Sequence, residues 1–224
     1  MSSPFILSQG AGQKLEFAID RNGGNTDDVD WLSAGENFKS VILLARGQAE
    51  IKLIVQPEPV PVPGVPFRFQ PWKTIQLGLY QTPAAYRAAL QAGGFQIGTY
   101  ADQILDKITI SPEVVSITIS KPFSVRDLGF TEATRYDAIC KRIIELGGQL
   151  CPDEVGPATR LKYPDQPKGE WFRTAMQALA VSDGDLLVFR IAHDDDGQWL
   201  GSSYGYPRTL SYPDLQFVCV IPRK

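Results

Sequence analysis

Apolar and polar residues alternate with a period of two in several short stretches of the chain, and this is the pattern of half-buried strands. The dipeptide Asp196-Gly197 separates two of these stretches and favours the tight turn of a β-hairpin. We therefore expect a mainly antiparallel sheet in the second half of the chain. The expected strands are 72–80, 114–120, 159–163, 171–178, 186–192, 198–204 and 215–221.

Helical periodicity alternates with these strands. Thr82 followed by Pro83 is typical of a helix start, because a threonine side chain caps the first turn and proline fits the first helical position. Thr99 with Asp102 has the spacing of a capping box, and Thr134 precedes the most regular apolar stripe. The expected helices are 83–92, 100–107 and 135–146.

The first part of the chain has its own pattern. Residues 8–20 are predicted to form a helix, and two β-rich runs, 38–45 and 49–55, flank Gly47 as a hairpin would. Residues 1–56 are therefore expected to form a small N-terminal αββ unit.

A proline-rich run, PEPVPVPGVP, occupies residues 57–66. Proline removes backbone donors and holds the chain near polyproline II geometry, so this run predicts a semi-rigid spacer over 57–70. Residues 71–224 then make a larger C-terminal domain, whose antiparallel sheet is expected to pack against two or three helices. The predicted fold class is α+β.

A string of short motifs in residues 72–224 resembles an uncharacterised family of bacterial hypothetical proteins. Among them are Trp72-Lys-Thr74, Asp127-Leu-Gly-Phe130, Leu150-Cys-Pro-Asp-Glu-Val-Gly-Pro157, Asp165-Gln-Pro-Lys-Gly-Glu-Trp171 and Asp194-Asp-Asp-Gly-Gln-Trp-Leu200. We know of no activity for that family, so the resemblance implies kinship and no chemistry.

The overall charge argues against nucleic acid as a class of partner. The formal net charge is −3 and the pI is near 5.3, which disfavours nucleic acid because phosphate binding depends on an excess of Lys and Arg. No apolar run approaches the roughly 18 residues of a membrane span, and the first residues lack the pattern of a secretory signal. We expect no membrane partner, no cofactor and a cytoplasmic location. The oligomeric state is left open.

Catalytic patterns are sparse. Gly201-Ser-Ser-Tyr-Gly205 matches the serine nucleophile motif, but Pro207 follows too soon for the helix that this motif requires. His193 is the single histidine, so a hydrolase would have to use it with Ser203 or with Cys151. His193 and the three aspartates that follow it are ligand types that a cation could use. Because aspartate favours turn geometry, we interpret this run as part of a solvated hairpin turn.

Aromatic residues provide the clearest functional hint. Rings with polar tips are enriched in recognition surfaces, and several stand in the strands and loops near the C-terminus. The leading hypothesis is a non-enzymatic interaction module that binds a protein or a small ligand. A small hydrolase using Ser203 or Cys151 with His193 is one alternative, and a structural subunit of a larger assembly is another. The proposed binding residues are Trp171, Trp199, Tyr204 and Tyr206.

Overall fold

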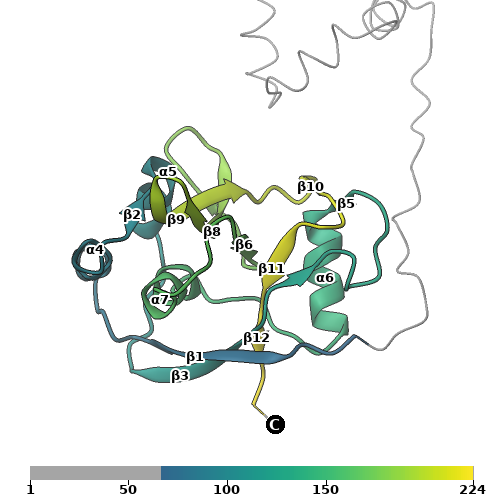
Figure 1. Ribbon diagram of the computed structural model, residues 1–224, viewed down its shortest axis with the longest axis horizontal. Coiled ribbons are helices and arrows are strands. Elements are labelled where there is room, and N and C mark those ends of the chain that lie inside the picture. The colour runs from purple at the N-terminus through teal and green to yellow at the C-terminus, as the bar shows by residue number, and fades with distance from the viewer. Residues whose placement is uncertain (1–66, 224) are drawn as a thin grey trace, which may run out of the picture. The chain divides into compact units, whose positions relative to one another are not determined.

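The computed structural model describes residues 67–223 of the 224-residue chain (Figure 1). The predicted N-terminal unit and the proline run therefore lie outside the described residues. Within them, helices and mainly antiparallel strands form an α+β fold. Four helices are present where two or three were expected: α4 (Pro83–Ala92), α5 (Thr99–Leu105), α6 (Tyr136–Glu145) and α7 (Val155–Lys162).

One large sheet organises the domain. Its strand order is β2-β9-β8-β6-β11-β4, and β7 also pairs with β8. Neighbours are antiparallel except for the pairs β2–β9 and β6–β11. The strands are β2 (Gln96–Ile97), β4 (Phe123–Ser124), β6 (Trp171–Thr174), β7 (Leu179–Ala180), β8 (Leu186–Asp194), β9 (Gly197–Tyr204) and β11 (Gln216–Val218).

Two smaller sheets complete the described fold. The first joins β1 (Pro71–Leu77) to β3 (Val115–Ser120) and β3 to β12 (Val220–Ile221), all antiparallel. The second is a short pair of β5 (Thr134–Arg135) with β10 (Leu210–Ser211). Just before β1, the rings of Phe67 and Phe69 pack against Phe123 of β4. Residues at the end of the predicted spacer thus contribute apolar contacts to the domain.

The hairpin of β8 and β9 is the longest paired segment, and it confirms the hairpin predicted from Asp196-Gly197. Its turn residues are Asp195 and Asp196, and Gly197 is the first residue of β9. Asp194 pairs with Gly197, and Gly197 has a φ of 129°, a conformation that side chains disfavour. Successive side chains of a strand point to opposite faces. The inner face, which is buried, carries Phe172, Phe189, Ile191 and Leu200. The outer face carries Trp171, Arg173, Arg190 and Trp199.

Helix α7 covers the inner face, and it replaces the strand predicted over 159–163. Pro157 lies in the first turn of α7, where its missing N–H costs no hydrogen bond. Gly156 allows the helix to touch the sheet, because a Cβ atom there would lie 2.4 Å from the ring of Phe189. Tertiary packing against β8 therefore overrides the weak strand preference of this segment.

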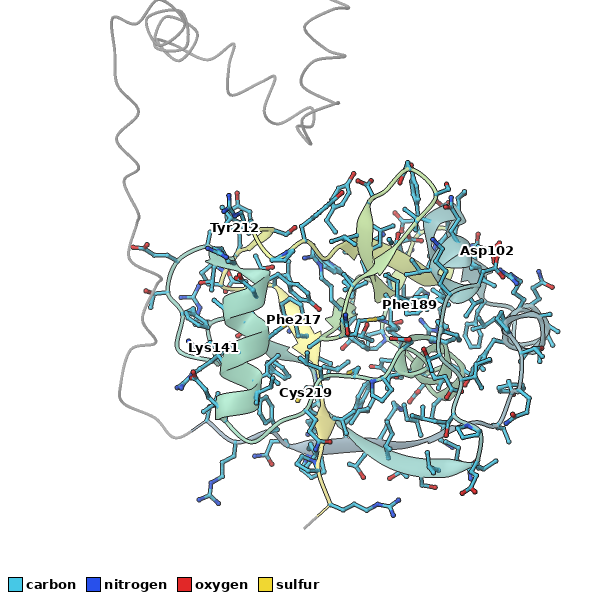
Figure 2. The ribbon with its side chains drawn as sticks, turned by 180° about the vertical axis from the view of Figure 1, so that it is seen from behind. Asp102, Lys141, Phe189, Tyr212, Phe217 and Cys219 are labelled. Carbon is cyan, nitrogen blue, oxygen red and sulfur yellow. The ribbon has the colours of Figure 1, made fainter. Side chains whose placement is uncertain are left out.

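Helix α6 packs on the opposite side of the sheet, over β11 (Figures 1 and 2). The ring of Tyr136 stacks on Phe217 with centroids 6.0 Å apart, and its hydroxyl donates to the carbonyl of Met176 at 2.6 Å. Ile139 and Ile143 fill the buried side of α6, while Ile144 is exposed. The helix thereby covers the β11 end of the outer face.

The helix starts follow the sequence only in part. Thr82 caps α4 as expected, accepting from the backbone N–H of Ala85 at 3.1 Å. Thr99 does not cap α5, since it is the first residue of that helix and Gly98 precedes it without a side-chain bond. Thr134 belongs to β5 and donates to the carbonyl of Glu132 instead of capping α6.

A buried carboxylate ties several segments together. Glu154, at the start of α7, accepts from the hydroxyl of Tyr86 at 2.8 Å and from the backbone N–H groups of Gly78 and Ser111 at 2.9 and 2.6 Å. These donors come from α4, from the turn after β1 and from the loop before β3. Burial and the Glu154 charge raise the pKa of Tyr86, which keeps this hydroxyl a donor. Glu154 thus has a structural role.

Candidate functional site

The four predicted binding residues fall into two separate groups. Trp171 and Trp199 both lie on the outer face, because each pairs with Ala192 of β8 from one side. Tyr204 comes five positions after Trp199 on the same strand, so its side chain points to the other face. Tyr206 follows the end of β9, and its ring lies beside that of Tyr204. The aromatic residues therefore do not form one surface.

The row next to the tryptophans consists of two arginines and a glycine. Arg173 of β6 pairs with Arg190 of β8, and Arg190 pairs with Gly201 of β9. Side chains directly opposite in an antiparallel pair have Cβ atoms about 4.5–5.5 Å apart, so the arginine side chains are neighbours. Gly201 leaves room for them, because a Cβ atom there would lie 3.3 Å from Nε of Arg190.

Neither of these arginines has a polar partner among residues 67–223. Nε and Nη1 of Arg173 and Nε of Arg190 are buried without a hydrogen bond, and no carboxylate of the described chain forms an ion pair with either residue. Burial, and next the charge of Arg190, lowers the pKa of Arg173. Like charges at opposite positions are destabilising, so this pair is a local cost to the fold.

The tryptophans border the arginine pair. The guanidinium carbon of Arg190 lies 5.8 Å from the centre of the Trp171 ring, and that of Arg173 lies 6.0 Å from it. Trp171 is 41% exposed, whereas Trp199 is partly buried and donates from Nε1 to Asp194 at 2.9 Å. We call the set Trp171, Arg173, Arg190 and Trp199 the arginine face.

A third arginine lies on the inner side and is bound very differently. Arg160 of α7 is fully buried, and its Nη atoms donate to side-chain oxygens of Gln166 and Gln198 and to the carbonyls of Tyr163 and Ala192. The ring of Phe95 covers its guanidinium carbon at 4.7 Å. Burial lowers the pKa of Arg160 to about 10, so it is still charged at neutral pH. These oxygen acceptors link α7 to the β8–β9 hairpin.

The structure does not bring the hydrolase candidates together. His193 was predicted to lie in the hairpin turn, and this is wrong because it belongs to β8 and pairs with Gln198. Its Nδ1 atom lies 2.6 Å from the carbonyl oxygen of Gln166. Ser203 lies near the end of β9, opposite Val188, which places it roughly 16 Å along the hairpin from His193. The Gly-x-Ser-x-Gly motif is therefore part of a strand and not a nucleophile elbow.

Cys151 is equally remote from His193. It bridges to Met176, beyond the far end of β6, whereas the backbone N–H of His193 donates to Glu170 just before the near end. Burial raises the pKa of the Cys151 thiol well above its ordinary value and that of the Cys140 thiol to about 11. Both thiols are thus protonated at neutral pH and weak as nucleophiles.

Within residues 67–223 no three metal-ligating side chains of His, Cys, Asp or Glu converge.

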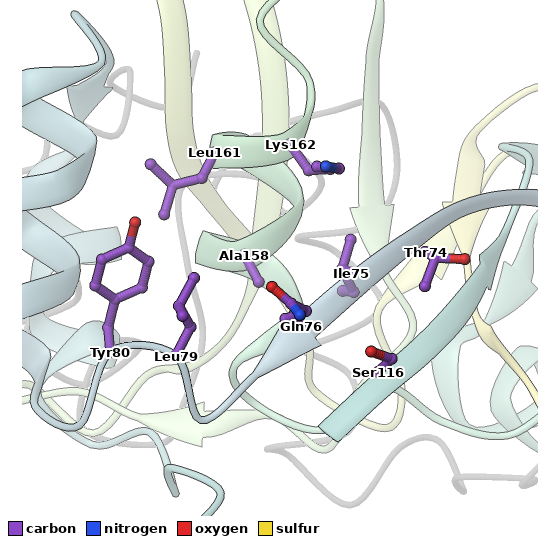
Figure 3. A pocket seen from close by; sticks show the side chains of 9 residues that line it. All are labelled: Thr74, Ile75, Gln76, Leu79, Tyr80, Ser116, Ala158, Leu161 and Lys162. Atoms are coloured by element: carbon purple, nitrogen blue, oxygen red, sulfur yellow. The ribbon is translucent and has the colours of Figure 1, made fainter. Parts of the chain in front are cut away.

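A surface pocket of about 440 Å³ lies between the β1–β3 ribbon and α7 (Figure 3). Its apolar end is formed by Leu79, Tyr80 and Leu161, and its polar end by Thr74 and Ser116. Lys162 is the only charged residue among the lining residues of this pocket. The volume suits a small molecule, but the lining offers no buried polar atom that lacks a partner. The arginine face is therefore the stronger candidate.

No family model, curated protein or solved structure matches the chain. The family resemblance, the cytoplasmic location and the structural-subunit alternative stay predictions. No helix within residues 67–223 is long and apolar enough to cross a membrane.

Sequence reasoning missed Arg173 and Arg190. The available signal was one arginine within each of two strands that are mainly apolar, Trp171–Thr174 and Leu186–Asp194. Only the pairing register shows that the two arginines are neighbours.

Proposed function

We propose that this protein is a non-catalytic binding module that holds an anionic group, a phosphate or a carboxylate of its ligand, on the arginine face. Arg173 and Arg190 would donate to the anion, and Trp171 would contact the adjoining part of the ligand through its exposed ring. The observation that supports this proposal is the row of buried guanidinium N–H groups without partners. Buried donors normally have hydrogen bonds, and unpaired ones are costly.

The chemistry of arginine favours this class of ligand. Its guanidinium is planar and presents paired donors that match the oxygens of phosphate and carboxylate. An anion beside Arg173 and Arg190 would offset the mutual repulsion of their charges. Asp194 lies four residues beyond Arg190 on the same strand face, roughly 13 Å along the strand, and already accepts from Trp199. It is therefore too distant to neutralise the pair.

The proposal predicts that inorganic phosphate stabilises the full chain. At a phosphate concentration ten times the Kd, binding contributes about 1.4 kcal/mol, which raises the Tm by roughly 3–6 °C for a domain of this size. Differential scanning fluorimetry in phosphate, compared with chloride at equal ionic strength, measures this shift. In Arg173→Met and Arg190→Met variants we expect the shift to vanish, since each variant removes half of the site.

Arg126→Met is the matched control, because Arg126 is an exposed arginine paired with the exposed Asp214. The Tm shift that phosphate causes in Arg126→Met should equal the shift in the wild type. A response that survives in Arg173→Met and Arg190→Met, or that disappears in Arg126→Met as well, would show that phosphate acts elsewhere. Titration calorimetry with citrate extends the comparison to carboxylates.

A further inference from the structure

A second surface, near the C-terminal end of β9, carries three exposed tyrosine rings. Tyr204 and Tyr206 have ring centroids 6.1 Å apart with an interplanar angle of 34°. Tyr100, at the start of α5, lies close enough to interact electrostatically with Tyr204. The exposed fractions of Tyr100, Tyr204 and Tyr206 are 46%, 53% and 36%. Tyrosine is enriched among the hot-spot residues of protein interfaces.

Two carboxylates stand beside these rings. The hydroxyl of Tyr206 donates to Asp185 at 2.6 Å, and Asp183 raises the pKa of Tyr100 through its charge and a hydrogen bond. Both aspartates come from the turn between β7 and β8, and Asp185 of this turn holds the hydroxyl of Tyr206. We call Tyr100, Asp183, Asp185, Tyr204 and Tyr206 the tyrosine patch.

The negative charge of this patch is not neutralised within the described part of the chain. Neither Asp183 nor Asp185 forms an ion pair with a lysine or arginine among residues 67–223. A cation does lie in this region, since Lys107 donates from Nζ to the carbonyl of Ala180. That contact engages Lys107 with the backbone of β7 and leaves both carboxylates available.

We propose that the tyrosine patch docks a peptide segment of a partner protein that presents arginine side chains. A guanidinium stacks on tyrosine rings through its cationic plane, and its N–H groups match carboxylate oxygens. Both features are present here within one small surface. This inference is independent of the anion site, because the ligand has the opposite charge and Tyr204 points to the face opposite Trp199.

The test uses a dye-labelled hexa-arginine peptide and the full chain, with fluorescence anisotropy as the readout. We expect saturable binding that weakens about tenfold in Tyr204→Ala, because losing a cation–π contact costs on the order of 1–2 kcal/mol. Tyr204→Phe keeps the ring and should bind like the wild type. The double variant Asp183→Asn, Asp185→Asn should also bind more weakly, since it removes the charge of the patch.

Two controls make the result specific. Tyr212 is 73% exposed but lies near α6 (Figure 2), so Tyr212→Ala should leave the peptide affinity unchanged. Arg190→Met should also leave it unchanged, which separates this inference from the anion site. Equal affinities for Tyr204→Ala and the wild type would overturn the proposal. Sedimentation showing a Tyr204-dependent dimer of the chain would overturn it too, because the occupant would then be a second copy.

Discussion

The two faces of the large sheet hold arginines in opposite ways. On the inner face, Arg160 has its Nη donors bound to oxygen atoms from α7, from the loop that follows it and from the β8–β9 hairpin. On the outer face, Arg173 and Arg190 stand side by side with no acceptor in the described chain. Both Nη groups of Arg160 thus have acceptors within the described chain and only its Nε is unpaired, whereas no hydrogen bond of the described chain reaches either outer guanidinium.

The inner and outer arginines are expected to contribute to the stability of the fold in different ways. A buried charge is tolerated when hydrogen bonds satisfy it, and removing it then leaves its acceptors unpaired. An adjacent pair of like charges instead reduces stability, so its presence calls for another explanation. Binding residues commonly carry such a cost. On this argument Arg160 stabilises the fold, and recognition is the role that we propose for the arginine face.

The largest effect is expected at Arg160. Arg160→Met fills similar volume but leaves the oxygens of Gln166, Gln198, Tyr163 and Ala192 without their donors. We expect the free energy of unfolding to fall by about 3–5 kcal/mol. Urea denaturation followed by tryptophan fluorescence measures this loss. A loss below about 1 kcal/mol would mean that Arg160 is not needed for stability. Arg160 would then not differ from the outer arginines in its contribution to the fold.

A smaller loss is expected where α7 touches the inner face. Gly156→Ala places a methyl group 2.4 Å from the Phe189 ring, which must shift together with its neighbours. Overpacking of this kind costs about 1–3 kcal/mol. On the outer face, Gly201→Ala meets only the guanidinium of Arg190 at 3.3 Å and serves as the matched control, with a smaller change. The same denaturation measurement compares the two alanines, and equal losses would contradict the difference in packing.

The smallest effect, with the opposite sign, is expected at Arg190. Arg190→Met removes one charge of a like-charged pair, so the free energy of unfolding in phosphate-free buffer should stay the same or rise by up to about 1 kcal/mol. Denaturation in such a buffer checks the sign. A loss comparable to that of Arg160→Met would identify Arg190 as a structural residue and would undermine the anion site.

Local patterns determined much of the secondary structure. Alternation identified the strands that became β8 and β9, Asp196-Gly197 identified their turn, and Thr82-Pro83 identified the start of α4. Strand alternation, tight turns and helix starts depend on residues a few positions apart, so they can be predicted from the sequence. The strand predicted over 159–163 is wrong, because α7 is stabilised there by the contact of Gly156 with Phe189, which is distant in the chain.

The candidate sites depended on the tertiary structure far more. The sequence predicted Trp171, Trp199, Tyr204 and Tyr206 as binding residues, and this stays a prediction. Strand alternation alone already implies that Trp199 and Tyr204 point to opposite faces. It gave no means of placing Arg173 beside Arg190, because the register between β6 and β8 joins residues seventeen positions apart. Charge neighbours across a sheet are decided by that register, and pairing register is a property of the folded chain.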